Sequence, residues 1–495
     1  MGFKTVDYII VLAYLVGVAG FGVIVGGKQK NAADYFVGGR KIPWLVVSFA
    51  IVATETSAIT FISIPGLAYL TNLNFLQIAI GYIVGRIAIA FLFLPSYYNG
   101  ELVTAYELLK TRFGDKTRNY ASIVFLVTRT LATGVRLFTT AIPIAIIFNG
   151  YRIFTGHSIT FVYAVAIIII TVFTFIYTYT GGIRAVIWTD VVQMFVYIGG
   201  AAIALYIMLS HLPNGWGSVV AAAAAHSKFQ FIHFGFSGGL ANFFTLKYTF
   251  VASVLGGAFL SMASHGTDQL IVQRLLATNS LKNSQKAVIA SGFFVAIQFL
   301  FFLLIGVALF AFYHAFPFKD GDQIFPKFII DQLPSGVSGI IVAGLLASAM
   351  GSLSGSISSL ASSTLVDLYK PYFGRNTSEE KDLKLSKLFS VIWTVILVAT
   401  AFIFIHSTES VIEIALSIAS VTYGGLLGTF LLGVLFKKPR QTDAIIGFTA
   451  GLAVLVYVFF FTPIAWTWYT MIGSLTTIVV GLISSALSIS SKPQS

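Results

Sequence analysis

The chain has 495 residues, of which 57% are hydrophobic and only 10% are charged. A soluble globular domain carries about 25% charged residues, so most of this surface must face lipid rather than water. The net charge of +12 would suit a nucleic-acid partner, but the basic residues lie in short loops between apolar runs, which excludes that partner and indicates membrane orientation. Because the chain has no cysteine, disulfides, thiolate metal sites and cysteine nucleophiles are also excluded.

Long apolar runs predict an all-α integral membrane protein with thirteen transmembrane helices. A helix needs about 20 apolar residues to cross a bilayer core. The first run is too long for a signal-peptide core, so we interpret it as a retained span. The predicted spans are residues 6–26, 43–69, 74–97, 119–149, 158–180, 184–209, 247–270, 284–313, 337–365, 387–406, 410–436, 442–461 and 466–488.

The distribution of basic residues predicts the orientation of these spans. When the amino terminus is placed outside, most of the 30 Lys and Arg residues fall in loops on the inner side, as cytoplasmic loops require. We therefore expect a multi-pass protein of the plasma membrane with its amino terminus outside and its carboxyl terminus in the cytoplasm. The lipid bilayer is then an obligatory partner, and the oligomeric state is not determined by the sequence.

Polar residues interrupt the second span at mid-membrane, in the segment Ala53-Thr54-Glu55-Thr56-Ser57-Ala58-Ile59-Thr60. One interpretation is a broken helix whose free carbonyls and hydroxyls bind a cation and a solute. The alternative is a continuous helix whose hydroxyls bond to the preceding turn or to a neighbouring helix. The carboxylate within the cluster favours the broken helix, because charges inside a bilayer are expensive and usually functional.

The ninth span carries a second polar cluster, which begins at Ser348 and continues through Ser352, Ser354 and Ser356. Sodium needs about five or six oxygens without a strong field, and neutral hydroxyls and carbonyls supply these better than carboxylates do. The two clusters together would form such a cage. Tight helix packing by small residues is the competing explanation, and it applies best from Ser356 onward.

Charged residues inside the other spans are further candidates. Arg136 would clamp a solute carboxylate, or it would pair with Glu55 or with carbonyls. Arg129 lies seven residues earlier on a similar helix face, which leaves the division of roles between the two arginines open. Arg86 has no evident partner and is interpreted as a packing arginine. Asp190 is either a site carboxylate or a helix-start carboxylate favoured by the helix dipole.

Enzyme signatures are missing from the sequence. It contains no phosphate loop, no paired-histidine metal motif and no nucleophile elbow. His265 is a lone histidine, which on its own is typical of a core residue. We therefore expect a carrier of small polar solutes and not an enzyme.

Several longer motifs resemble those of the sodium/solute symporter family, which carries sugars, proline, sialic acid, iodide, vitamins and monocarboxylates with sodium. The resemblance runs from about residue 6 to 440. The motifs are Asp34-Tyr35-Phe36-Val37-Gly38-Gly39-Arg40, the segment 181–193 from Gly181 to Gln193, Gly266-Thr267-Asp268-Gln269 with Val272-Gln273-Arg274, Ala349-Met350-Gly351-Ser352-Leu353-Ser354, and the glycine-rich segment 424–433.

The resemblance implies two inverted five-helix repeats, at residues 43–209 and 247–436, with the second span broken. A first helix and a cytoplasmic loop precede them in residues 1–42. Residues 210–246 would form an extracellular loop between the repeats, and residues 437–495 would add two helices and a tail.

The resemblance also implies a sodium site between the broken second span and the ninth span. It would use the backbone carbonyls of Ala53, Thr56 and Ser348 and the hydroxyl of Ser352. A second sodium would use Asp190 and Ser354. This sequence departs from the family at Gly351 and Gly355, where members with a second sodium have hydroxyl-bearing residues.

By the same resemblance, the solute would lie between the broken spans. The residues implied to bind it are Ser57, Thr60, Phe75, Gln77, His265, Arg136 and Glu55. An acidic residue at Glu55 is similar to the proline branch and would strengthen the cation site or bind a solute amine, whereas Arg136 favours an acidic solute as in the sialic acid branch.

The expected function is sodium-coupled symport of a sugar, sugar acid, amino acid or organic acid by alternating access. The alternatives are a proton-coupled transporter that titrates Glu55 or Asp190, and a membrane sensor that binds solute without moving it.

Overall fold

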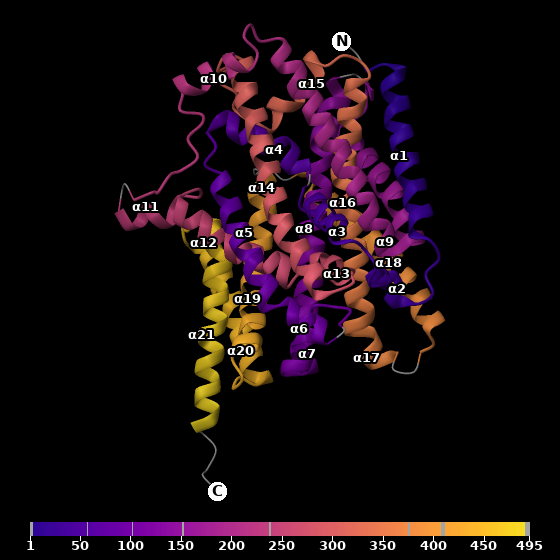
Figure 1. Ribbon diagram of the computed structural model, residues 1–495, viewed down its shortest axis with the longest axis vertical. Coiled ribbons are helices and arrows are strands. Elements are labelled where there is room, and N and C mark those ends of the chain that lie inside the picture. The colour runs from indigo at the N-terminus through magenta and orange to yellow at the C-terminus, as the bar shows by residue number, and fades with distance from the viewer. Residues whose placement is uncertain are drawn as a thin grey trace.

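The computed structural model describes residues 3–56, 58–100, 102–150, 153–236, 239–374, 377–406 and 411–490. Within these ranges every regular element is a helix, apart from one isolated bridge between Ile42 and Thr278. The prediction of an all-α protein is confirmed. Figure 1 shows the helices gathered into one elongated bundle, with the two termini at opposite ends of the longest axis.

The helices follow one another with short connections. The first part of the chain forms α1 (Thr5–Gly26), α2 (Ala32–Val37), α3 (Trp44–Glu55), α4 (Ala58–Leu70), α5 (Leu76–Leu92), α6 (Leu94–Asn99), α7 (Glu107–Phe113), α8 (Asp115–Gly150) and α9 (Ile159–Ser210). The second part forms α10 (Trp216–Ala225), α11 (Gly239–Thr245), α12 (Phe250–Gly266), α13 (Gln269–Leu276), α14 (Leu281–Phe312), α15 (Ile324–Gln332), α16 (Val337–Ser363), α17 (Lys370–Phe373), α18 (Glu379–Ile403), α19 (Val411–Leu435), α20 (Gln441–Phe461) and α21 (Tyr469–Ser490).

Each predicted span coincides with a helix or with part of one. Nine helices in the described ranges are long and apolar enough to cross a membrane, and the bent pair of α3 and α4 makes a tenth. α9 runs through two of the predicted spans, whereas α12 is only 17 residues long. A multi-pass membrane protein is therefore supported, and the count of thirteen stays a prediction.

A glycine marks the point where α9 joins two predicted spans. Gly182 has φ +57°, and a Cβ there would lie 2.6 Å from the backbone oxygen of Tyr35. Only glycine adopts that conformation without strain and leaves room for α2. The chain therefore bends at Gly182, which seats α2 against α9.

Large apolar side chains cover the outside of the peripheral helices. On α1, Leu12 and Val16 are 58% and 56% exposed, and on α21, Val479 and Ile483 are 53% and 55% exposed. Each pair has the spacing of one helix face. Such faces would be insoluble in water, so they are surfaces for lipid.

The serine-rich helix α16 lies at the centre of the bundle, in contact with α1, α3, α8 and α9 (Figure 1). Nearly all of its side chains are buried. Its many Ser, Gly and Ala residues permit this close packing. α16 thus brings its hydroxyls against the end of α3, where the second span breaks.

Candidate ion and solute site

The second span is broken where the sequence predicted. α3 ends at Glu55, and its axis makes an angle of 64° with the segment Thr60–Leu70. Thr56 adopts an extended conformation, with φ −75° and ψ 112°, and its N–H donates to the Val52 carbonyl oxygen over 3.0 Å. The end of a helix leaves its last carbonyl oxygens without N–H partners from a following turn, so the break provides free oxygen ligands at mid-membrane.

The predicted sodium residues on α16 meet this break. Ser352 Oγ donates to the Thr54 carbonyl oxygen over 3.3 Å, and Ser352 is buried. Ser348 lies one turn earlier on α16, and its hydroxyl donates to Leu345 O over 2.8 Å. Because that hydroxyl is engaged within its own helix, a role of Ser348 toward a cation falls to its backbone carbonyl.

Two buried oxygens without hydrogen-bond donors face the space above Gly351. Asp190 Oδ1 and Gln193 Oε1 are both buried and have no hydrogen-bond partner among the described residues. A Cβ at Gly351 would lie 2.9 Å from Gln193 Oε1, 3.2 Å from Asp190 Oδ1 and 3.9 Å from the Ala53 carbonyl oxygen. Glycine at this position therefore leaves room for the Gln193 amide, beside the proposed sodium ligands.

The second departure from the family, Gly355, has a matching explanation. A Cβ there would lie 2.5 Å from Arg274 Nη2. That same nitrogen donates to Asp190 Oδ2 over 2.8 Å, while Thr54 Oγ1 lies 3.3 Å from Oδ2. Asp190 is thus a buried ion-pair partner that lies well inside α9, and the interpretation as a helix-start carboxylate is wrong. Ser354, the other residue of the predicted second site, donates its hydroxyl to Gly351 O over 3.1 Å.

Glu55 is neutralised by an arginine to which the sequence analysis gave no partner. Arg86 Nη2 lies 2.5 Å from both Glu55 carboxylate oxygens, and Arg86 Nη1 donates to Ser291 Oγ over 2.7 Å. His265 Nε2 lies 3.1 Å from Glu55 Oε1. The interpretation of Arg86 as a packing arginine is wrong, because α5 faces the end of α3 and the two charges meet there. His265 is buried but lies beside Glu55 at the break.

The two arginines of α8 have different surroundings. Arg129 forms a close ion pair with Asp268, and its Nη2 also donates to Tyr423 Oη over 2.7 Å. Asp268 lies between α12 and α13, where the seventh predicted span stops being helical. Arg136 is half-buried, its Nε has no hydrogen-bond partner, and no carboxylate of the described residues is within ion-pair distance of it. Glu55 pairs with Arg86, so Arg136 remains available for a carboxylate from outside.

The remaining predicted solute residues have mixed surroundings. Thr60 and Phe75 are buried, 7% and 5% exposed, and the Phe75 ring packs against Tyr248 and Phe299 with centroids 5.4 and 5.3 Å away. Gln77 bonds to the backbone of Asn74, Tyr248 and His233, so its amide fastens a loop to α5. Ser57 lies outside the described residues.

Some residues of this region carried no assignment from the sequence. Arg274 and Asp268 stand in a family motif, which was a signal without a role. Gln298 and Tyr197 are single polar groups inside apolar spans. The isolated amide in the eighth span was the only hint for Gln298, because the side chains that it meets come from other helices.

Comparison with known proteins agrees with this geometry. The model of the sodium:solute symporter family matches residues 35–451. The sodium/sialic acid symporter NanT of Aliivibrio fischeri is 30% identical, with 98% of this chain and 94% of the relative covered. The sodium/sialic acid symporter SiaT of Proteus mirabilis is 28% identical, over 98% and 96%.

One solved structure is similar over almost its whole length. It is the substrate-bound outward-open state of a sodium-coupled sialic acid symporter, with a TM-score of 0.86, 27% identity and 98% of each chain covered. The human sodium/iodide cotransporter is 29% identical over 91% of this chain and 69% of its own length. Sodium coupling is common to these relatives, whereas the carried solute differs among them.

Proposed function

The chain belongs to the sodium:solute symporter family and is a sodium-coupled symporter that works by alternating access, and we propose that its solute is a sugar acid of the sialic acid type. It is a transporter and not an enzyme, and sodium is its co-transported ion. Its relatives are sodium-coupled transporters, so the proton-coupled and sensor alternatives lose their support.

The sodium site proposed here lies between α3 and α16. The carbonyls of Ala53, Thr56 and Ser348 and the hydroxyl of Ser352 would surround the ion. Support comes from the break after Glu55 and from the contact of Ser352 Oγ with Thr54 O. A sodium ion there replaces its lost water with these oxygens and holds α3 against α16, which prepares the neighbouring solute site. Because the coupling is reciprocal, solute tightens sodium by the same factor.

Arg136 carries the proposal about the solute. Its guanidinium has no carboxylate partner among the described residues, whereas Arg86 and Arg129 are each paired. An unpaired buried charge is costly, and a carboxylate that binds both guanidinium nitrogens would offset that cost. The sialic acid symporters with which this chain aligns almost end to end carry a solute with such a carboxylate.

The other solute contacts are proposed from the same region. Thr60 and Phe75 would line the site, with Ser57 at the break and His265 beside Glu55. Gln77 is not proposed to contact the solute, because its amide is used by three backbone groups. A second sodium at Asp190 and Ser354 is not proposed either, because Arg274 already supplies the positive charge that Asp190 needs.

The experiment is uptake of labelled sialic acid into proteoliposomes under an inward sodium gradient. Arg136→Gln should abolish most uptake, and Arg136→Lys should raise the KM for the acid, because lysine keeps the charge but loses the fork of donors. Neutral sugars should not compete. Unchanged sialic acid uptake by Arg136→Gln, or equal competition by a neutral sugar, would contradict the proposal.

The arrangement in the membrane is also proposed. The inverted repeats would comprise residues 43–209 and 247–436, and the amino terminus would lie outside the plasma membrane. The two breaks support this arrangement, since α3 with α4 and α12 with α13 occupy equivalent positions in the two repeats. Labelling of single cysteines introduced into this cysteine-free chain tests the orientation directly.

A further inference from the structure

Three buried polar side chains from three parts of the fold form a chain of hydrogen bonds that ends at the break. Tyr197 on α9 donates its hydroxyl to Gln298 Oε1 over 3.0 Å. Gln298 on α14 donates from Nε2 to Thr56 Oγ1 over 2.5 Å. Thr56 Oγ1 in turn donates to the Val52 carbonyl oxygen over 2.7 Å. The sequence separates these groups by as many as 242 residues.

The direction of each bond follows from the one before it. A phenol hydroxyl that donates to Oε1 fixes which end of the Gln298 amide faces Thr56, and that end can only donate. Thr56 Oγ1 therefore accepts, and its own proton is left for the Val52 carbonyl. The Thr56 N–H donates to the same carbonyl oxygen. Two donors from one residue on one acceptor fix both the side chain and the backbone of Thr56 at the end of α3.

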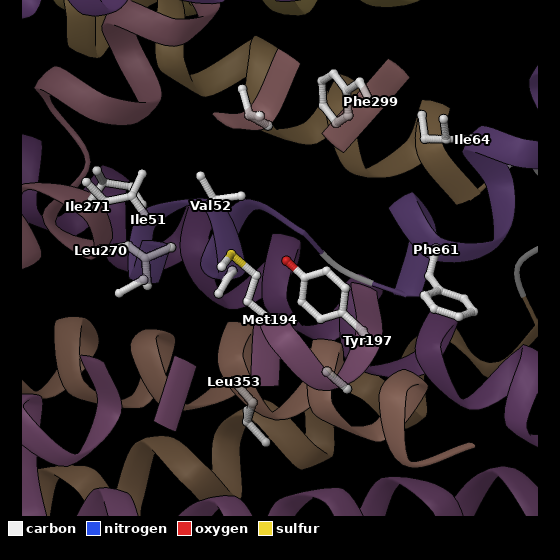
Figure 2. Close-up of a cluster of buried hydrophobic side chains, with 14 of the residues drawn as sticks. Ile51, Val52, Phe61, Ile64, Met194, Tyr197, Leu270, Ile271, Phe299 and Leu353 are labelled. Carbon is white, nitrogen blue, oxygen red and sulfur yellow. The ribbon is translucent and has the colours of Figure 1, made fainter. Parts of the chain in front are cut away.

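The surroundings of this chain are apolar. Tyr197, Gln298 and Thr56 are 0%, 4% and 1% exposed. Figure 2 shows Tyr197 in the hydrophobic cluster between Val52 of α3 and Phe61 of α4, with its hydroxyl directed to the side where α3 ends. A buried amide that loses one of its partners pays the full desolvation penalty of that group. The chain of bonds is therefore held in one arrangement.

We propose that Gln298 and Tyr197 are positioning residues for the coupled sodium ion, holding Thr56 so that its backbone carbonyl faces α16. This inference rests on the sodium site proposed above. Neither side chain is a ligand, because both act through the Thr56 hydroxyl. Their effect is on the affinity for sodium, and the solute site is affected only through the coupling between the two.

The experiment measures sodium binding to the purified protein without solute, from the rise of the melting temperature with sodium concentration, with choline as the replacement cation. Tyr197→Phe keeps the ring and its packing, and Gln298→Leu removes both links. Each should raise the half-saturating sodium concentration about threefold to tenfold, the range expected for one lost buried hydrogen bond. The double variant should be no worse than Gln298→Leu, because Tyr197 acts only through Gln298.

The matched control is Tyr35→Phe. Its hydroxyl is also buried and donates to Thr178 O in another part of α9, so its loss should leave the half-saturating sodium concentration unchanged. In uptake assays at saturating sodium, Tyr197→Phe should keep the wild-type KM for the solute. A structural weakening alone would lower the melting temperature without moving the sodium midpoint.

The outcomes separate this inference from the proposals on which it rests. If Ser352→Ala weakens sodium binding while Tyr197→Phe and Gln298→Leu do not, the positioning role is overturned and the sodium site stands. If Ser352→Ala has no effect, the sodium site falls and the positioning role falls with it. Failure of sialic acid uptake would concern the solute alone, since the sodium titration needs no solute.

Discussion

Replacement of Ser352 by Ala tests the site at its most exposed assumption. The change removes one hydroxyl from α16 and leaves the helix backbone intact. In the structure that hydroxyl makes one long bond of 3.3 Å to Thr54 O, which contributes about 0.5–1 kcal/mol to folding at most. The melting temperature without sodium should therefore fall by about 2 °C or less.

The effect on sodium should be much larger than the effect on stability. An oxygen that contacts an ion contributes about 1.5–3 kcal/mol, as hydrogen bonds to charged groups do. Its loss should raise the half-saturating sodium concentration by about tenfold to a hundredfold, because 1.4 kcal/mol corresponds to a factor of ten. Solute affinity at low sodium should fall through the reciprocal coupling.

The assay is initial uptake into proteoliposomes as a function of sodium concentration, with the melting temperature as a second measurement. Ser348→Ala is the matched control, one turn earlier on the same helix. Its hydroxyl bonds to Leu345 O, and only its backbone carbonyl is assigned to the ion, so sodium dependence should stay within about twofold of wild type. Equal sodium dependence of Ser352→Ala and wild type would refute the site.

Two further substitutions test the packing of polar groups around the break. Gly351→Ser would place a Cβ 2.9 Å from Gln193 Oε1, so it should destabilise the protein by about 1–3 kcal/mol, and Gln193→Ala should relieve most of that loss; a melting temperature equal to wild type for Gly351→Ser alone would disprove the close approach. Arg86→Gln leaves the Glu55 carboxylate without its guanidinium and should cost about 3–5 kcal/mol. The double variant Glu55→Gln with Arg86→Gln should recover much of this loss, and thermal unfolding that ranks the double variant below the single one would contradict the ion pair.

Much of the fold was predictable because a bilayer imposes simple requirements on a sequence. A span must be apolar for about 20 residues and must satisfy its own backbone, so apolar runs mark helices directly. The break was also visible, since Thr54 to Thr60 crowds polar groups where lipid requires apolar ones. The structure confirms the break after Glu55 and the contact of Ser352 with the end of α3.

Partners between helices were the part that the sequence analysis missed or left open. Arg86 was given no partner and Arg136 was offered Glu55, whereas the structure pairs Glu55 with Arg86. Asp190 was left open between a site and a helix start, and it is paired with Arg274. A sequence shows the rotation of a residue about its own helix, but the rotation and depth of the facing helix are needed to name its partner.

The sequence by itself determined that this protein is a bundle of membrane helices, that its second span breaks at mid-membrane, and that hydroxyl-rich segments accompany the break. These follow from local composition, because lipid leaves a chain few alternatives. Only the tertiary structure decided which charges neutralise each other, why glycines stand at 351 and 355, and that Tyr197 and Gln298 reach Thr56. Those outcomes depend on how helices distant in sequence pack, where differences of a few ångströms decide whether two polar groups meet.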